Sequence, residues 1–196
     1  MDIEQIKRLK SLTGVGLTDA KQALEEAKGD FDKALKAMRV KGLAKADKKS
    51  EREARAGLVD SYVHSDRIGV IVEVNCETDF VARTDDFKGL VHDVAMHIAA
   101  SSPRYLSRED IPKADLKEES ELIKTELKQA GKTGAMAEKI LDGKLEKWYA
   151  EVVLMEQPYI KDPDMRVEDY VKQAIARLGE NIVVRKFSRI ELGESS

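Results

Sequence analysis

Apolar residues in the first part of the chain recur at the three- and four-residue spacing of short helices, which two glycine-containing turns interrupt. Thr18 and Asp30 are placed to cap the second and third helices, and Gly42 is placed to end the third. We therefore predict a three-helix bundle over residues 1–41, a size typical of docking modules. Its expected core residues are Ile3, Ile6, Leu9, Ala20, Ala23, Leu24, Ala27, Phe31, Leu35 and Met38.

Residues 42–56 have a different composition, because Lys, Asp, Glu, Arg and Ala replace almost all large apolar residues. These residues are good helix formers, so we predict a charged helical linker between two domains, with a flexible tether as the alternative. Acidic residues are interleaved with the basic ones. This mixture argues against a nucleic-acid-binding patch in the linker.

A pattern with a period of two residues begins after this linker. From Ile68 to Cys76 every second residue is apolar, which is the period of a half-buried strand. The polar, turn-like residues 64–67 join this run to an earlier one, Leu58–Val63, so a β-hairpin is predicted over residues 57–76. A last run rich in β-branched residues, Ile182–Leu192, predicts a third strand, the practical minimum for a stable sheet.

Helical periodicity returns between these strands. It predicts one helix from Thr84 to about Ala100 and another over residues 167–178, which Gly179 ends. Two charged helices with narrow apolar stripes are expected over residues 115–156 as an outlying pair, and a connecting loop follows at 157–164. The pattern thus predicts an α+β protein whose core domain, residues 57–196, packs about three antiparallel strands with helices.

Composition narrows the class of protein. The chain has 196 residues, of which 36% are charged and 42% hydrophobic, values typical of a soluble globular protein. No apolar run approaches a membrane span, and the N-terminus lacks the apolar segment of a secretory signal. The single cysteine, Cys76, cannot form an internal disulfide, which favours the cytoplasm. A net charge of -3 and 5% aromatic residues argue against nucleic acid as a direct partner.

The candidate catalytic and metal-binding motifs in the chain lack the residue spacing or the neighbouring secondary structure that such sites require. Gly14–Gly16 lacks the third glycine of a dinucleotide-binding turn, and Gly131–Thr133 lacks the earlier glycine of a phosphate-binding loop. His92 and His97 are five residues apart on a predicted helix, so they face different sides instead of sharing a metal. We therefore expect no metal and no cofactor, and no residue pattern supports an enzyme.

The segment Asn75–Arg83 is the strongest candidate for a binding site. It lies where a predicted strand passes into a predicted helix, and binding residues gather at such corners. An acid, Asp79, stands beside an aromatic residue, Phe80. The pattern leaves two interpretations: Phe80 is either the first core residue of the following helix or a residue that contacts a partner.

Several segments of the chain, in the same order, resemble the signatures of one family. They are Thr13–Leu24 (TGVGLTDAKQAL), Val74–Arg83 (VNCETDFVAR), Ala95–Ala100 (AMHIAA) and Gly179–Arg185 (GENIVVR). Ordered matches over almost the whole chain are far more specific than any one motif. By them the chain is identified as a member of the bacterial elongation factor Ts family, and its length resembles the short form of that family.

The resemblance implies a guanine-nucleotide exchange factor that promotes GDP release from the GTPase elongation factor Tu and acts by binding. It implies a ubiquitin-associated-like fold for residues 1–41 and, for the short form, a two-fold homodimer. Thr78, Asp79, Phe80 and Val81 would enter the GTPase near its Mg²⁺ and phosphate site, with Phe80 as a wedge between apolar side chains.

The resemblance also implies docking positions in the N-terminal bundle: Lys7, Lys10, Leu17, Thr18 and Lys21. Relatives often have two methionines at positions 17 and 18, so helix capping is an alternative role for Thr18. For the lysines, the alternative is that they are ordinary solvated surface residues. Two other function classes stay open, a ubiquitin-associated-like adaptor and an RNA- or ribosome-binding protein. The balanced charge does not favour the latter.

Overall fold

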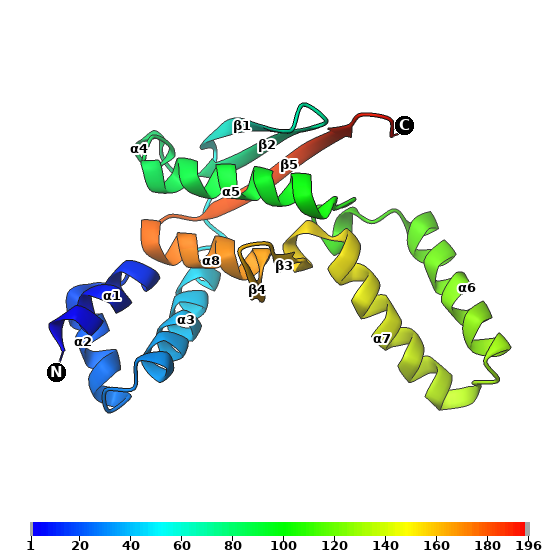
Figure 1. The fold of residues 1–196 in the computed structure, drawn as a ribbon, viewed down its shortest axis with the longest axis horizontal. Helices are drawn as coiled ribbons and strands as arrows, with labels where there is room; N and C mark the ends of the chain where they lie inside the picture. Colours follow the sequence, from blue (N-terminus) through cyan, green and yellow to red (C-terminus); the bar gives the residue numbers. More distant parts are fainter. Residues whose placement is uncertain (1, 195–196) are drawn as a thin grey trace.

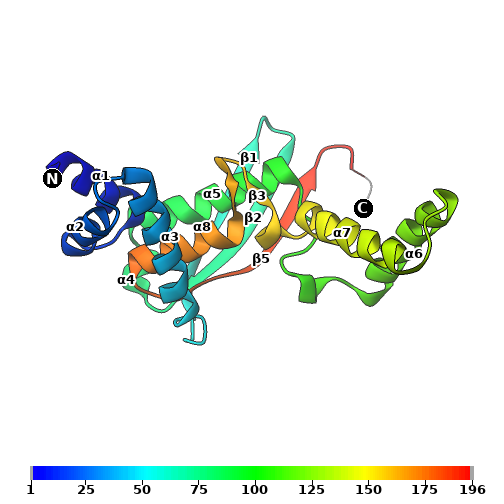
Figure 2. The ribbon, with the colours of Figure 1, turned by 90° about the horizontal axis from the view of Figure 1, so that it is seen from below.

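The computed structural model describes residues 2–194 and shows three regions along one long axis (Figures 1 and 2). A helical bundle lies at one end, a pair of long helices lies at the other, and a sheet covered by helices lies between them. The predicted α+β class, with three N-terminal helices and a three-stranded sheet, is confirmed. None of the described helices is long and apolar enough to cross a membrane.

The bundle consists of α1 (Ile3–Thr13), α2 (Leu17–Glu26) and α3 (Phe31–Asp47). Asp30 caps α3 as predicted, since its carboxylate accepts a hydrogen bond from the Lys33 amide. The prediction that Thr18 caps α2 is wrong, because the extended backbone ends at Gly16 and the helix starts directly after it. The buried residues are Ile6, Leu9, Ala20, Ala23, Leu24, Ala34 and Met38, whereas Ile3, in the terminal turn, is exposed.

Helix α3 is longer than the sequence pattern predicts. It continues through Gly42 to Asp47, and the predicted linker helix is wrong beyond that residue, since residues 48–52 form turns and 53–55 have no regular structure. Gly42 is buried against α8, where an added Cβ would lie 3.5 Å from the Ala176 side chain. Gly42 therefore lies in the contact between α3 and α8, and it does not end the helix.

The central sheet contains β1 (Ala56–His64), β2 (Ile68–Cys76) and β5 (Ile182–Glu191), all antiparallel in the order β1-β2-β5. The β1–β2 turn places Ser65 and Asp66 at φ values of 50° and 57°, the left-handed region that suits the twist of a tight hairpin. The inward-facing residues of β2 are Val70, Val72, Val74 and Cys76, and all are buried.

Two helices cover the inner face of the sheet. Helix α5 (Asp85–Ser101) packs on β1 and β2, and α8 (Val167–Leu178) lies between α5 and α3 (Figure 1). The bundle also touches α8 at Gly14, which has a φ of 66° and lies so close that an added Cβ would be 2.3 Å from Arg177 Cγ. Helix α8 therefore supports both the core and the bundle.

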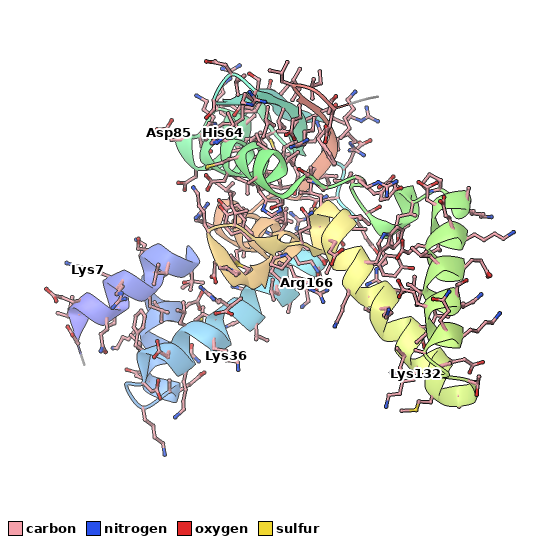
Figure 3. All side chains as sticks on the ribbon, turned by 45° about the vertical axis from the view of Figure 1, so that its right-hand side comes forward. Lys7, Lys36, His64, Asp85, Lys132 and Arg166 are labelled. Carbon is pink, nitrogen blue, oxygen red and sulfur yellow. The ribbon has the colours of Figure 1, made fainter. Side chains whose placement is uncertain are left out.

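The two helices predicted as an outlying pair are α6 (Lys113–Gln129) and α7 (Gly134–Val152), which project from the core with Lys132 near their tip (Figure 3). At the base of the pair, the short helix η1 (Arg108–Asp110) supplies Arg108. Its guanidinium binds the carboxylates of Glu146 and Glu156, and it lies 4.1 Å from the centre of the Tyr149 ring. These contacts fix α7 to the core.

The segment predicted as a loop at residues 157–164 contains a small hairpin instead. Pro158–Tyr159 (β3) pairs with Asp162–Arg166 (β4), after the short helix η2 (Leu154–Glu156). Tertiary contacts stabilise this pairing, because the buried Tyr159 ring stacks on Tyr170 at a centroid distance of 4.3 Å. The two prolines and the polar residues of this segment are typical of a loop, so the sequence pattern did not predict the hairpin.

Candidate partner-binding site

Residues Thr78–Val81, called here the Thr78 turn, form an exposed single turn at one end of the sheet. Strand β2 leads into α4 (Asp79–Ala82), and α5 follows after two further residues. Thr78 is the N-cap of α4, and its hydroxyl accepts a hydrogen bond of 3.5 Å from the Val81 amide. The Thr84 hydroxyl donates to the Val81 carbonyl at 2.7 Å and closes the turn.

Phe80 points into solvent. Its exposed fraction, 86%, is the highest among the large hydrophobic residues that the structure describes. The interpretation of Phe80 as a core residue is therefore wrong, because α4 has only one turn and buries only Ala82. Complete burial of a Phe side chain releases about 1.5–3 kcal/mol, so a partner that covers Phe80 would gain free energy of that order.

The corner between α8 and β5 holds the Thr78 turn from behind. The Glu180 carboxylate accepts hydrogen bonds from the amides of Glu77 and Thr78, both at 3.0 Å, and from the Thr78 hydroxyl at 2.6 Å. In the opposite direction, the Glu77 carboxylate accepts one from the Asn181 amide at 2.6 Å. Sequence reasoning gave Glu180 no role, and its place in the family segment Gly179–Arg185 was the only available signal.

Cys76 lies beneath the Thr78 turn. Its buried thiol donates a hydrogen bond to the Thr78 carbonyl at 3.2 Å. Burial raises the pKa of the Cys76 thiol, and the nearby Glu180 carboxylate raises it further. The thiol is therefore protonated at neutral pH and supports the turn as a structural group.

The predicted docking residues of the bundle lie on α1 and α2, and all are exposed: Lys7, Lys10, Leu17, Thr18 and Lys21. Leu17 is 56% exposed, and the Lys21 ammonium lies 3.8 Å from the Glu25 carboxylate. Figures 1 and 2 both show the bundle and α4 toward the same end of the molecule, away from α6 and α7. Both sets of predicted site residues therefore belong to elements at one end of the molecule.

The histidines do not form a metal site. His97 is fully buried, with Nδ1 accepting from the Ile160 amide at 3.3 Å and Nε2 donating to Gln157 at 2.9 Å, and burial lowers the pKa of His97. His92 is half-exposed and lies 3.4 Å from the Asp60 carboxylate. Within residues 2–194, no group of three His, Cys, Asp or Glu side chains is placed to hold a metal.

A pocket of about 300 Å³ lies between α6 and α7, close to their tip. Its lining includes three lysines, Lys124, Lys128 and Lys132, and two leucines, Leu127 and Leu141. It lies at the opposite end of the molecule from the Thr78 turn (Figure 1). The pocket therefore does not contribute to the surface that carries Phe80.

Comparison with known proteins decides the family. A sequence profile described as Elongation factor TS matches residues 4–194. The chain belongs to the elongation factor Ts family. Elongation factor Ts of Herpetosiphon aurantiacus is 49% identical over 196 residues, which are 100% of this chain and 99% of the relative. That of Thermoanaerobacter sp. (strain X514) is 52% identical over 192 residues, 97% of this chain and 94% of the relative.

These relatives have nearly the length of this chain, so its resemblance to the short form of elongation factor Ts is confirmed. Elongation factor Ts is a nucleotide-exchange factor of translation elongation and is not an enzyme. The individual roles of the Thr78 turn and of the docking residues stay predictions, to which the structure adds the exposure of each side chain.

Proposed function

We propose that this protein is a guanine-nucleotide exchange factor that promotes GDP release from elongation factor Tu by inserting the Thr78 turn near the Mg²⁺ and phosphate site of that GTPase. The observation that carries this proposal is the almost complete exposure of Phe80 on a turn that is anchored to the core. An aromatic ring buries a large area with few torsions to freeze, which suits a wedge.

The mechanism follows from how a GTPase holds its nucleotide. Phosphate-loop amides, a lysine and Mg²⁺ bind the phosphates of GDP. Phe80 wedges between apolar side chains of the GTPase, while Asp79 brings negative charge close to the metal and disturbs its surroundings. The distorted GTPase binds GDP less tightly, and by reciprocity a new nucleotide weakens the binding of the exchange factor.

The N-terminal bundle delivers the turn to its target. Lys7, Lys10 and Lys21 offer positive charge, and Leu17 offers an apolar contact on the nucleotide-binding domain of the GTPase. Thr18 lies beside Leu17 within α2, where its exposed side chain is free to join this contact instead of capping the helix. Docking at the bundle raises the local concentration of the Thr78 turn at the nucleotide site.

The direct test is the release of fluorescent GDP from elongation factor Tu in the presence of substoichiometric amounts of this protein. Release should accelerate in proportion to the amount added, and each molecule should act many times. Release that stays at the spontaneous rate would contradict the proposed function. An adaptor would bind the GTPase without accelerating release, so a parallel binding measurement separates the two classes.

We also propose that the protein forms a homodimer through the outer face of its sheet. Val59, Val63, Ile71 and Ile190 come from all three strands of this face and are between 56% and 72% exposed. On the same face, Lys186 lies 3.4 Å from Glu73. A two-fold axis would bring together two such apolar faces and allow the charged pair of one copy to meet that of the other.

Ile71→Lys tests this interface, because burying a lysine between two sheets costs more than the dimer gains. Wild-type protein should sediment with twice the monomer mass at micromolar concentration, and the variant should sediment as a monomer. Val40→Lys is the matched control, since Val40 is 61% exposed on α3 and should leave the dimer intact. A wild-type protein that stays monomeric throughout this range rules out the dimer.

A further inference from the structure

The contacts of Glu180 join parts of the chain that are far apart in sequence. Its three hydrogen-bond donors belong to Glu77 and Thr78, which precede it by 103 and 102 residues. One oxygen of the carboxylate accepts both backbone amides, and the other accepts the Thr78 hydroxyl. Both oxygens of the Glu180 carboxylate thus bind the start of the Thr78 turn.

The same corner is tied to the segment that leaves the bundle. The Asn181 side chain donates to the carbonyls of Ser50 and Arg52, at 3.2 and 2.6 Å, and the Lys49 ammonium donates to the Gly179 carbonyl at 2.5 Å. The Arg52 guanidinium also lies 3.6 Å from the Glu77 carboxylate. Residues 179–181 therefore connect the segment after α3 with the segment that carries Phe80.

The Thr78 turn has little stability of its own. Helix α4 spans only four residues, and a helix of one turn does not form in isolation. Its N-cap bond from the Val81 amide is long, at 3.5 Å, and its only buried residue is Ala82. The direction in which Phe80 points thus depends on contacts from outside the turn, and the Glu180 carboxylate supplies the shortest of them.

We propose that Glu180 is a positioning residue for nucleotide exchange: its carboxylate holds the Thr78 turn so that Phe80 is presented in the orientation needed to enter the GTPase. This inference rests on the proposed exchange function. Glu180 touches neither nucleotide nor metal in this role. It acts by removing the need to order the turn during binding, which is the general advantage of preorganisation.

Three substitutions separate positioning from charge. Glu180→Ala removes both acceptor oxygens, and with them the three hydrogen bonds, and should lower kcat for GDP release about tenfold, the loss expected for one hydrogen bond to a charged group. Glu180→Asp keeps the charge but shortens the reach, so it should be similarly impaired. Glu180→Gln should retain most activity, because its oxygen can accept both amides while its amide group donates to the Thr78 hydroxyl.

The KM for the GTPase should change less than about twofold in these variants, because the bundle that docks is untouched. Glu51→Ala is the matched control. Glu51 is exposed in the neighbouring turn and forms no ion pair within residues 2–194, so its loss should leave kcat unchanged. An active Asp variant together with an impaired Gln variant would show that charge matters and would overturn the positioning role.

A double-mutant cycle with Phe80→Ala shows whether Glu180 acts through Phe80. Glu180→Ala should reduce kcat much less in the Phe80→Ala background than in wild type, whereas equal reductions in both would overturn the inference. Hydrogen exchange of the free protein adds a readout that does not depend on the GTPase. The amides of Glu77, Thr78 and Val81 should lose protection in Glu180→Ala, while those of β2 keep it.

Retained protection at all three amides would show that the turn is ordered without Glu180 and would overturn the inference. The two proposals fail in different ways. If wild type does not accelerate GDP release, the exchange function fails and the role of Glu180 fails with it. If wild type is active and Glu180→Ala has the wild-type kcat, only the role of Glu180 is wrong.

Discussion

The Thr78 turn and the α6–α7 pair both project from the core, and they are held in opposite ways. The helices of the pair satisfy their own backbone hydrogen bonds and bury few residues, Ile123 and Leu127 in α6 and Trp148 in α7. The Thr78 turn is short, and its shape depends on Glu180, which lies 102 residues beyond Thr78. Length gives the pair its reach, whereas long-range contacts give the turn a fixed orientation.

This difference indicates which projection suits a binding role that needs accuracy. A side chain that must enter another protein at one position has to be presented rigidly, and the turn meets this condition close to its anchor. The start of α7, at the tip of the pair, lies about three turns of helix away from Glu146, to which Arg108 binds. Figure 1 shows the pair projecting from the core. Substitutions at matched positions in the two projections should therefore differ in effect.

The largest effect is expected from truncating the exposed aromatic residue. Phe80→Ala should lower kcat/KM for GDP release by about 30-fold or more, the loss typical of an interface residue that contributes at least 2 kcal/mol. Met136→Ala is the control, because Met136 is 68% exposed on α7 and its loss should change release less than about twofold. Thermal unfolding should be unchanged in both, since neither side chain is buried. A folded Phe80→Ala protein with wild-type exchange would remove the wedge from the mechanism.

A smaller effect on exchange is expected when the base of the helix pair is loosened. Arg108→Ala removes the contacts to Glu146 and Glu156, whose carboxylates raise the pKa of Arg108. The half-exposed position limits the loss to about 1 kcal/mol of unfolding free energy, which denaturant titration followed by Trp148 fluorescence can measure.

Lys124→Ala is the control for Arg108, since Lys124 pairs only with Glu121 on its own helix among the described residues. Its unfolding free energy should stay close to that of wild type. GDP release should fall less in Arg108→Ala than in Phe80→Ala. The reverse order would show that the helix pair, and not the Thr78 turn, is the more important projection.

The smallest effect on exchange is expected from pH, which acts on the stability of the protein through His97. Burial lowers the pKa of His97, so the unfolded chain takes up a proton at a higher pH than the folded protein does. This contribution to stability is present above the unfolded value of 6.5 and is lost as pH falls from there toward the lower folded pKa. The slope is at most about 1.4 kcal/mol per pH unit for one proton.

Denaturant titrations at about pH 7.5 and about pH 5.5 measure this loss of unfolding free energy. Histidine is the side chain that titrates between these two pH values. His97→Gln should show a shallower dependence than wild type. Protonation would break the contact from the Ile160 amide and disturb Gln157, whose side chain also donates to the Glu151 carbonyl at 2.6 Å. Equal pH dependence in the two proteins would exclude His97 as the titrating group.

Much of the architecture could be predicted because local patterns and tertiary packing agree there. The alternation in β2 and the periodicity of α5 and α8 each lead to the observed element. Predictions failed where tertiary contacts override local preference. Gly42 continues a helix because α8 packs on it, and residues 158–166 pair because Tyr159 is buried on Tyr170.

The change from strand to helix period and the family signature both indicated the segment that carries Phe80, but the exposure of that side chain could not be predicted from the sequence. Periodicity treats Phe80 as part of the following helix, and it cannot show that α4 and α5 are separate elements. The exposure of Phe80 depends on how the chain turns at Thr84, which begins a new helix by capping the Phe87 amide at 3.2 Å.

The sequence by itself determined the α+β class, the three strands, the family and the segment that carries Phe80. These properties reside in local periodicity and in ordered motifs, which need no coordinates. Only the tertiary structure decided that Phe80 faces solvent and that Glu180 holds its turn. A carboxylate far along the chain acts through distances and directions between atoms, and a linear pattern contains neither.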